Sequence, residues 1–297
     1  MTATTGTTAR HWVAGARPRT LPAAVAPVLV GTGAAIDLGA VEPVRAVLAL
    51  VVSLALQVGV NYANDYSDGI RGTDAERVGP VRLVGQGLAE PGAVKRAAFA
   101  AFGVAAVAGL VLVALSGTWW LLAVGALSIV AAWYYTGGRN PYGYNGLGEL
   151  FVFVFFGLVA VLGTTYTQAL QVSVAAVLGA VAVGLLACAI LVVNNLRDVP
   201  TDTTSGKRTL AVRLGEPRTR VLYAALLGGA FVCVVATALH APGYLWTLLA
   251  LAPAPLAVVA ATTVLRGAWG PGLVPVLAAT GRLELLLALL LGLGLAA

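Results

Sequence analysis

Long apolar runs separated by polar loops dominate the pattern along this chain of 297 residues. Each run is close to the ~20 residues that cross the hydrocarbon core of a bilayer as a helix. We therefore predict an all-α membrane protein with nine transmembrane helices. The predicted segments are Leu21–Ile36, Ala46–Ala63, Ala97–Leu115, Trp119–Thr136, Leu150–Leu170, Val172–Val193, Val221–Leu239, Tyr244–Leu265 and Leu283–Ala297.

Composition supports this class of protein. The chain is 59% hydrophobic and only 10% charged, with a mean hydropathy of +0.91, which no water-soluble domain could bury. A net charge of +6 raises the question of nucleic acid binding, but the basic residues lie in loops between apolar runs, so we expect no nucleic acid partner. Residues 1–297 are expected to form one transmembrane domain, with residues 1–16 as a flexible, Thr-rich cytoplasmic tail.

The distribution of loop charges predicts how the chain is oriented. Of the 18 basic residues, 17 lie in the tail and the loops on one side of the predicted membrane, and only Arg45 lies on the other. Positively charged loops mark the cytoplasmic side. We therefore predict a multi-pass protein of the cell membrane whose N-terminus and long loops are cytoplasmic and whose C-terminus is outside.

Two acidic pairs stand where apolar runs end. Asp65 and Asp68 are spaced i,i+3 after the second run, with Asp74 soon after, and Asp198 and Asp202 are spaced i,i+4 after the sixth. Both spacings place the two carboxylates on one helix face. The asparagines that precede them are Asn61, Asn64, Asn194 and Asn195. With so few charges in the chain, this arrangement predicts one site formed by the two helix ends.

Carboxylates on two adjacent helix ends suit Mg²⁺, which prefers oxygen ligands and often borrows phosphate oxygens. Basic residues close by could hold the remaining phosphate oxygens; they are Arg71, Arg82, Lys207 and Arg208. A diphosphate site over a lipid-accessible cavity follows. The alternatives are that the aspartates are solvated loop charges, that the basic residues only set topology, and that the asparagines join helices by hydrogen bonds.

The motifs around these pairs resemble a known family. They are Arg17-Pro18-Arg19-Thr20-Leu21-Pro22, Asn64-Asp65-x-x-Asp68 with Asp74, Pro141-Tyr142-Gly143-Tyr144 with Gly146-Leu147-Gly148-Glu149, and Asn194-Asn195-Leu196-Arg197-Asp198-x-x-x-Asp202 followed by Gly206-Lys207-Arg208. They are similar to those of the UbiA superfamily of intramembrane aromatic prenyltransferases. The resemblance covers the chain from Arg17 to about Gly215, and more loosely to its end.

The resemblance implies a ring of nine helices around a central cavity and gives roles to particular residues. It implies Mg²⁺ held by Asp65, Asp68, Asp198 and Asp202, with Asp74 joining them. It implies diphosphate contacts from Lys207, Asn64, Asn195 and Arg82, and a place near the reacting centre for Tyr135 and Arg139. An anionic acceptor also needs a cation, for which Arg197 or Arg139 would serve.

The expected activity is prenyl transfer. The motifs are most similar to those of members that transfer a polyprenyl group from polyprenyl diphosphate to 1,4-dihydroxy-2-naphthoate, with loss of CO₂, on the route to menaquinone. Within the family, 4-hydroxybenzoate and homogentisate are the alternative acceptors. A cation-coupled transporter is disfavoured because its carboxylates would lie near the middle of the membrane. A CDP-alcohol phosphotransferase is disfavoured because Asp68-Gly69-Ile70-Arg71 matches only the start of its motif.

Overall fold

The computed structural model describes residues 7–72 and 81–297, and within these ranges every regular element is a helix. The α-helices are α1 (Ala9–Gly15), α2 (Pro22–Asp37), α3 (Pro43–Arg71), α4 (Pro91–Ser116), α5 (Leu121–Tyr134), α6 (Gly148–Val152), α7 (Ala160–Ala169), α8 (Val174–Thr204), α9 (Leu210–Leu214), α10 (Glu216–His240), α11 (Ala254–Leu265) and α12 (Leu273–Ala296). Short 3₁₀ turns cover Pro18–Thr20, Tyr142–Asn145, Pro242–Leu251 and Gly270–Gly272, and a π-helical segment covers Phe153–Val159. The predicted fold class is confirmed.

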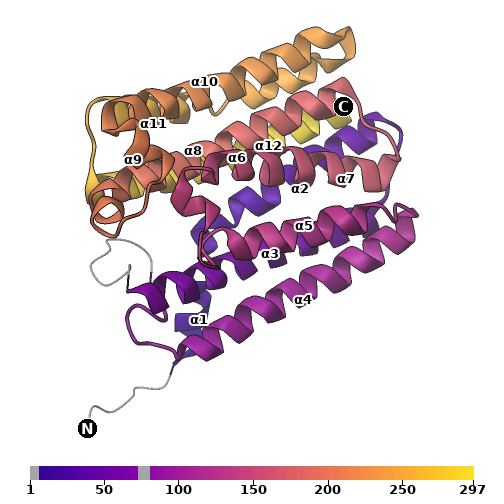
Figure 1. The fold of residues 1–297 in the computed structure, drawn as a ribbon. Coiled ribbons are helices and arrows are strands. Elements are labelled where there is room, and N and C mark those ends of the chain that lie inside the picture. The colour runs from indigo at the N-terminus through magenta and orange to yellow at the C-terminus, as the bar shows by residue number, and fades with distance from the viewer. Residues whose placement is uncertain (1–6, 73–80) are drawn as a thin grey trace.

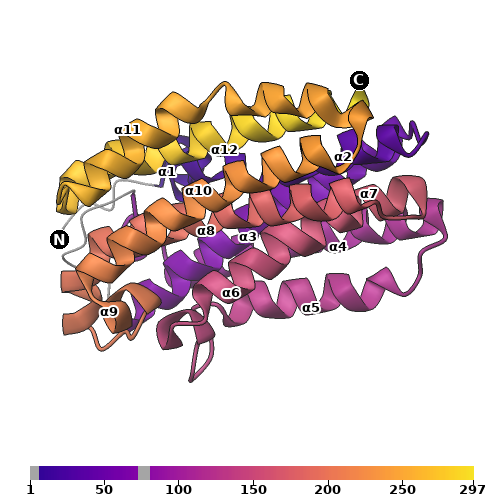
Figure 2. The same cartoon turned by 90° about the horizontal axis from the view of Figure 1, so that it is seen from above.

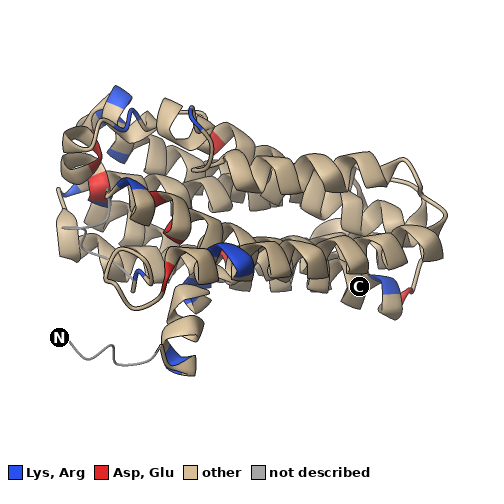
Figure 3. Ribbon diagram, turned by 60° about the horizontal axis from the view of Figure 1, so that its bottom comes forward, with Lys and Arg blue, Asp and Glu red and all other residues tan. Residues whose placement is uncertain are grey.

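The long helices lie side by side and form one elongated bundle (Figures 1 and 2). Helix α3 packs against α4, α8 against α10, and α12 against α2, while α2 also packs against α7. Most charged residues gather at one end of the bundle, where α3 and α8 finish (Figure 3). We call this the charged end. Helix α1 lies there, and the C-terminus lies at the opposite end (Figure 1).

Helix ends follow from local sequence. Proline at the first helical position begins α2, α3 and α4, at Pro22, Pro43 and Pro91, where its missing N–H is no loss. Glycine ends α3 and α4: Gly72 and Gly117 adopt left-handed backbone conformations, with φ of 69° and 72°. The apolar runs are thus bounded by the residues best suited to start and stop helices.

Among the described residues, six to eight helices are long and apolar enough to span a membrane, so the predicted count of nine is not confirmed. Six helices pass as spans on their own, and two bent pairs, 9–37 and 242–265, count as one span each at most. Helix α5 has 14 residues and is too short to pass. An α-helix of that length covers only about 21 Å. All nine predicted segments are nevertheless largely helical.

Two helix boundaries differ from those of the predicted segments. Residues 9–15 form helix α1 instead of a flexible tail, because the ring of Trp12 packs edge-on against Tyr62 and its carbonyl accepts a hydrogen bond from the Tyr62 hydroxyl. The last helix begins at Leu273, ten residues before the predicted start. The polar stretch that includes Arg282 and Glu284 interrupts the apolar run in the sequence but not the helix, and Glu284 is buried.

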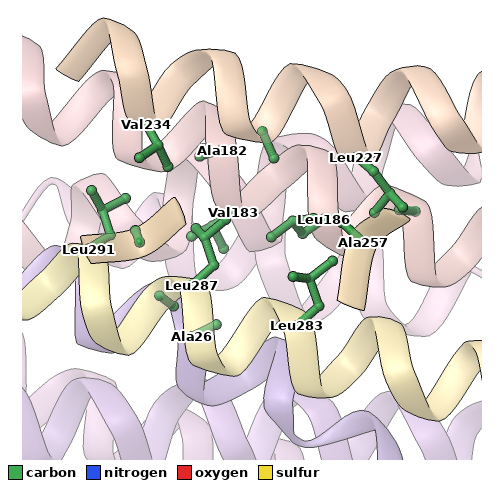
Figure 4. Close-up of a cluster of buried hydrophobic side chains, with 14 of the residues drawn as sticks. Ala26, Ala182, Val183, Leu186, Leu227, Val234, Ala257, Leu283, Leu287 and Leu291 are labelled. Carbon is green, nitrogen blue, oxygen red and sulfur yellow. The ribbon is translucent and has the colours of Figure 1, made fainter. Parts of the chain in front are cut away.

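The main apolar core lies between α8, α10 and α12 and extends to α2 and α11 (Figure 4). Val183, Leu186, Leu287 and Leu291 are among its fully buried members. Small residues allow close helix contacts beside it: a Cβ on Gly33 of α2 would lie 2.2 Å from the carbonyl oxygen of Gly292 on α12. Helices in membranes associate through such contacts because lipid offers no hydrophobic driving force between them.

A cavity lies beside this core. Its walls come mostly from the chain between α2 and α8, with further lining residues just before α2 and just after α8. Helix α12 contributes Leu277, and no residue of α10 or α11 lines the cavity. The π-helical segment forms part of the wall next to α8. A Cβ on Gly157 of this segment would lie 2.7 Å from the Cα of Gly184 on α8, so the two backbones are in direct contact.

Candidate active site

The cavity has a volume of about 550 Å³ and two chemically different parts. Apolar side chains line most of it, from α3, α4, α5, the π-helical segment and α7. Polar side chains cluster where it reaches the charged end: Arg17, Asp68, Arg82, Asp202 and Lys207. A long apolar chain with a charged head group matches this division.

Lys207 joins the two acidic pairs predicted from sequence. Its Nζ lies 3.3 Å from Oδ1 of Asp68 on α3 and 4.0 Å from Oδ1 of Asp202 on α8. All three side chains are buried. Both helices continue far enough to carry the acids, since α3 ends at Arg71 and α8 at Thr204. One carboxylate of each predicted pair therefore faces the same cation.

Asp68 has further partners at the mouth of the cavity. A guanidinium nitrogen of Arg82 lies 3.9 Å from its Oδ2, and the Tyr144 hydroxyl donates a hydrogen bond to its Oδ1. The ring of Tyr144 also faces Lys207, whose Nζ is 4.5 Å from the ring centroid. A buried carboxylate is stable only with such compensation. Asp68 is the residue on which these contacts converge.

Asp65 lies behind this cluster and does not line the cavity. Its carboxylate accepts hydrogen bonds from the backbone N–H groups of Leu83, at 2.7 Å, and Val84, at 3.0 Å. Arg17 interacts with it electrostatically. Asp65 thus fixes the loop that carries Arg82, and its role as a metal ligand stays a prediction.

Asp198 is likewise engaged locally. Its carboxylate accepts two hydrogen bonds from the neighbouring guanidinium of Arg197, at 2.7 and 2.8 Å, and both side chains are buried. Arg197 also donates to the Asn194 side chain at 2.9 Å. Neither Asp198 nor Arg197 lines the cavity. The prediction that Arg197 reads an acceptor carboxylate is therefore not supported by its position.

Three other predicted residues do line the cavity. Asn64 accepts a hydrogen bond from the Thr136 hydroxyl at 2.8 Å, and Asn195 donates one to Glu149 at 3.1 Å. Tyr135 forms an aromatic wall with Tyr142, whose ring lies edge-on at 5.5 Å.

That wall continues toward the π-helical segment. The ring of Tyr142 stacks on Phe151 with centroids 4.0 Å apart, and both line the cavity. Burial raises the pKa of the Tyr142 hydroxyl, which donates a hydrogen bond to the Ala131 carbonyl. This face of the cavity therefore offers aromatic rings and no charge.

Three predicted basic residues do not line the cavity. Arg71 donates to the carbonyls of Thr136 and Gly138 and so braces the loop after α5. Arg139 is exposed, because the chain turns at Gly138 (φ 75°) and carries it outward. Arg208 is exposed too. A substrate contact from any of the three stays a prediction, and Asp74 lies outside the described residues.

The predicted cluster of metal-binding carboxylates is not assembled. In the ranges 7–72 and 81–297, no three acidic, His or Cys side chains gather in a way that could hold a metal ion. The donor chemistry nonetheless fits Mg²⁺: Asp68 and Asp202 already share a cation, the Lys207 ammonium, and amide oxygen donors lie nearby on Asn64. Of the predicted metal ligands among the described residues, Asp68 and Asp202 line the cavity.

Sequence reasoning gave no role to Arg17 and Tyr144. Both belong to motifs quoted above, but their positions depend on contacts distant in sequence. Arg17 adopts a left-handed backbone conformation (φ 53°), and the turn that follows is held by Asn61, which donates to the Ala16 carbonyl at 2.9 Å and to Thr20 at 3.0 Å. The available signal was an asparagine, Asn61, within an otherwise apolar run.

These residues form an apolar chamber with buried cations and carboxylates at one end. An integral membrane enzyme that acts on a lipid diphosphate needs such a chamber. The chain belongs to the UbiA prenyltransferase family, whose sequence model matches residues 24–271.

Relatives with assigned activities are similar over almost the whole chain. The 1,4-dihydroxy-2-naphthoate octaprenyltransferase of Mycobacterium tuberculosis is 58% identical over 279 residues, which is 94% of each chain. The enzyme of the same name from Escherichia coli is 42% identical, covering 96% of this chain and 94% of its own. A solved UbiA homologue from Archaeoglobus fulgidus, bound to GPP and Mg²⁺, shares the fold with a TM-score of 0.68 at 15% identity, covering 96% of this chain and 99% of that one.

Proposed function

We propose that this protein transfers a polyprenyl group from polyprenyl diphosphate to 1,4-dihydroxy-2-naphthoate, with loss of CO₂, to form demethylmenaquinol. The observation that carries the proposal is the pair Asp68 and Asp202 around Lys207, with Arg82 beside them, at the head of an apolar cavity. The names of the relatives supply the acceptor. We propose that the protein lies in the cell membrane and that its active site faces the cytoplasm. The basic loops lie at the same end of the bundle as the site, and basic loops mark the cytoplasmic side.

The donor is bound by its two parts. Its prenyl tail would occupy the apolar chamber, and its diphosphate would meet Lys207 and Arg82, both buried and cationic. Mg²⁺ would be held by Asp68 and Asp202, with Asn64 as a further oxygen donor. When bound, it neutralises charge that develops on the leaving diphosphate. Asp65 and Asp198 support these substrate-binding residues indirectly. Asp65 fixes the loop that carries Arg82, and Asp198 accepts hydrogen bonds from Arg197.

The chemistry proposed for these residues begins with cleavage of the allylic C–O bond. Its electron pair leaves with the diphosphate, which the cations of Lys207 and Arg82 stabilise. The prenyl carbocation is shielded from water by the apolar cavity and by the rings of Tyr135 and Tyr142. The electron-rich naphthoate ring bonds to the prenyl carbon, and the carboxylate leaves as CO₂ with its electron pair remaining on the ring.

The test is turnover by the purified protein in detergent or proteoliposomes. With Mg²⁺, a long polyprenyl diphosphate and 1,4-dihydroxy-2-naphthoate, we expect a prenylated, decarboxylated product by mass spectrometry, and loss of turnover with EDTA that added Mg²⁺ restores. 4-Hydroxybenzoate and homogentisate are expected to give no product. Equal or faster use of either monocyclic acid would keep the donor site but reject the assigned acceptor.

A further inference from the structure

Another buried carboxyl group, that of Glu149, lies next to the cavity and has no part in the chemistry above. Glu149 begins α6 and is 9% exposed. Its Oε1 accepts a hydrogen bond from Nδ2 of Asn195 at 3.1 Å, and its Oε2 has no hydrogen-bond partner among the described residues. Its own carbonyl accepts a hydrogen bond from the Cys188 thiol at 3.1 Å, which ties α6 to α8.

From this contact we propose that Glu149 is a positioning residue: it turns the Asn195 carboxamide so that its oxygen faces the cavity and accepts a hydrogen bond from a hydroxyl of the aromatic acceptor. The inference rests on the proposed function. The residue that touches the acceptor is Asn195, and Glu149 acts through it.

The direction of the hydrogen bond carries the argument. A carboxylate only accepts, so Asn195 must offer Glu149 its Nδ2. The amide oxygen lies on the other branch of the side chain, away from Glu149, and Asn195 lines the cavity. An oxygen at the wall repels diphosphate oxygens but accepts from a hydroxyl. This differs from the diphosphate contact expected for Asn195 from family resemblance.

The depth of Asn195 in the bundle agrees with this role. It precedes Asp202 by seven residues on α8, which at the rise of an α-helix is about 10 Å farther from the charged end. That distance places it below the diphosphate, at the level of the reacting carbon and the ring.

The surroundings are also suited to an aromatic ligand. A Cβ on Gly148, the neighbour of Glu149, would lie 3.4 Å from the Tyr135 ring and 3.2 Å from Leu191, one turn before Asn195. Glu149 and Asn195 therefore border the aromatic wall. A flat, hydroxylated ring against that wall would bring a hydroxyl within reach of the asparagine.

The experiment exchanges the donor and the acceptor of this hydrogen bond. Asn195→Asp removes the donor and faces Glu149 with a second acceptor; we expect the acceptor KM to rise about tenfold, with the KM for polyprenyl diphosphate unchanged. Adding Glu149→Gln supplies a new donor, and the double variant should return to within about threefold of wild type. Glu149→Gln alone, which keeps an acceptor oxygen, should change the acceptor KM by less than about threefold. Glu216→Gln, at an exposed position, is the matched control.

Each result is decisive. Rescue in the double variant supports the proposal, because a merely structural role would not restore acceptor KM when two changes are combined. Independent, additive losses overturn it, as does an Asn195→Asp variant with an unchanged acceptor KM. These isosteric changes keep the size of both side chains, and a thermal melt of each variant checks folding. If the single Asn195→Asp variant fails to fold, the double variant is compared with Glu149→Gln alone. An acceptor KM that is equally raised in both of these variants overturns the proposal. Failure of the wild type to prenylate the naphthoate would instead reject the proposed function.

Discussion

Replacing Asp68 with asparagine tests the centre of the candidate site, because this carboxylate contacts Lys207, Arg82 and Tyr144. At an effective dielectric constant of about 20, charges 3.3 Å apart attract by roughly 5 kcal/mol and charges 3.9 Å apart by roughly 4 kcal/mol. Much of this is offset by desolvation, so the net cost of leaving buried Lys207 and Arg82 without their carboxylate is about 3–5 kcal/mol. Lys207 keeps Asp202 at 4.0 Å, which favours the lower value.

The rate should fall more than the stability alone explains. Loss of one preorganised electrostatic group typically lowers turnover by ~10²–10³-fold. We therefore expect Asp68→Asn to lose at least about a hundredfold in kcat at saturating Mg²⁺, and to melt at a lower temperature. The assay is product formation by mass spectrometry, with thermal unfolding measured on the same preparation.

The matched control is Asp37→Asn, the same chemical change at an exposed aspartate of the opposite end, where only the Tyr244 hydroxyl contacts it among the described residues. It should leave turnover and melting unchanged. Turnover by Asp68→Asn within about threefold of wild type would refute the reasoning, because the group would then be a structural charge with no contact to the reacting diphosphate.

Three further predictions follow from burial and position. Lys207→Met should lower turnover by ~10²-fold or more, whereas Arg139→Ala, at an exposed site, should change it by less than about twofold; equal losses would return Arg139 to the active site. With Cys188 and Cys233 replaced, a cysteine introduced at Thr203 should react with a membrane-impermeant reagent only from the cytoplasmic side, and one at Ala241 only from outside; reaction of both from one side would contradict the orientation. Glu284→Met should raise the melting temperature, by the equivalent of about 1–3 kcal/mol. Glu284 is fully buried, and neither of its carboxyl oxygens has a hydrogen-bond partner in the part of the chain described. A lower melting temperature would show that Glu284 stabilises the fold.

The sequence predicted helices well because each apolar run is itself a local signal. The sequence predicted helices less well where a helix extends beyond its apolar run or forms without one. At α12 the residues Arg282 and Glu284 interrupt the run, yet the helix continues because neighbouring helices bury Glu284. At α1 the helix exists without an apolar run, held by Trp12 against Tyr62. Both outcomes depend on tertiary contacts that no local pattern contains.

The sequence predicted which residues form the candidate site but not how their side chains are arranged. Spacing placed Asp65 and Asp68 on one helix face, but it could not show that Asp65 would accept from the backbone of Leu83 and Val84. Nor could it show that Lys207, 139 residues away, would reach Asp68. The neighbours Arg197 and Asp198 could pair with each other or with substrate, and only packing decides between these outcomes.

The direct backbone contact between Gly157 and Gly184 divides the chamber into a stiff wall and a yielding one. Helix α8 is buried along most of its length, and even a single Cβ on Gly157 would lie only 2.7 Å from the Cα of Gly184, so α8 packs closely against the π-helical segment. Helix α5, on the facing side, has Ala131 as its one buried residue among those described. We therefore expect a bulky lipid to enter and leave past α5 and not past α8, because fewer buried side chains hold α5 in place. Turnover would then be limited by the rate at which α5 moves away from the cavity. Stiffening α5 against α4 would slow product release without changing the rate of prenyl transfer.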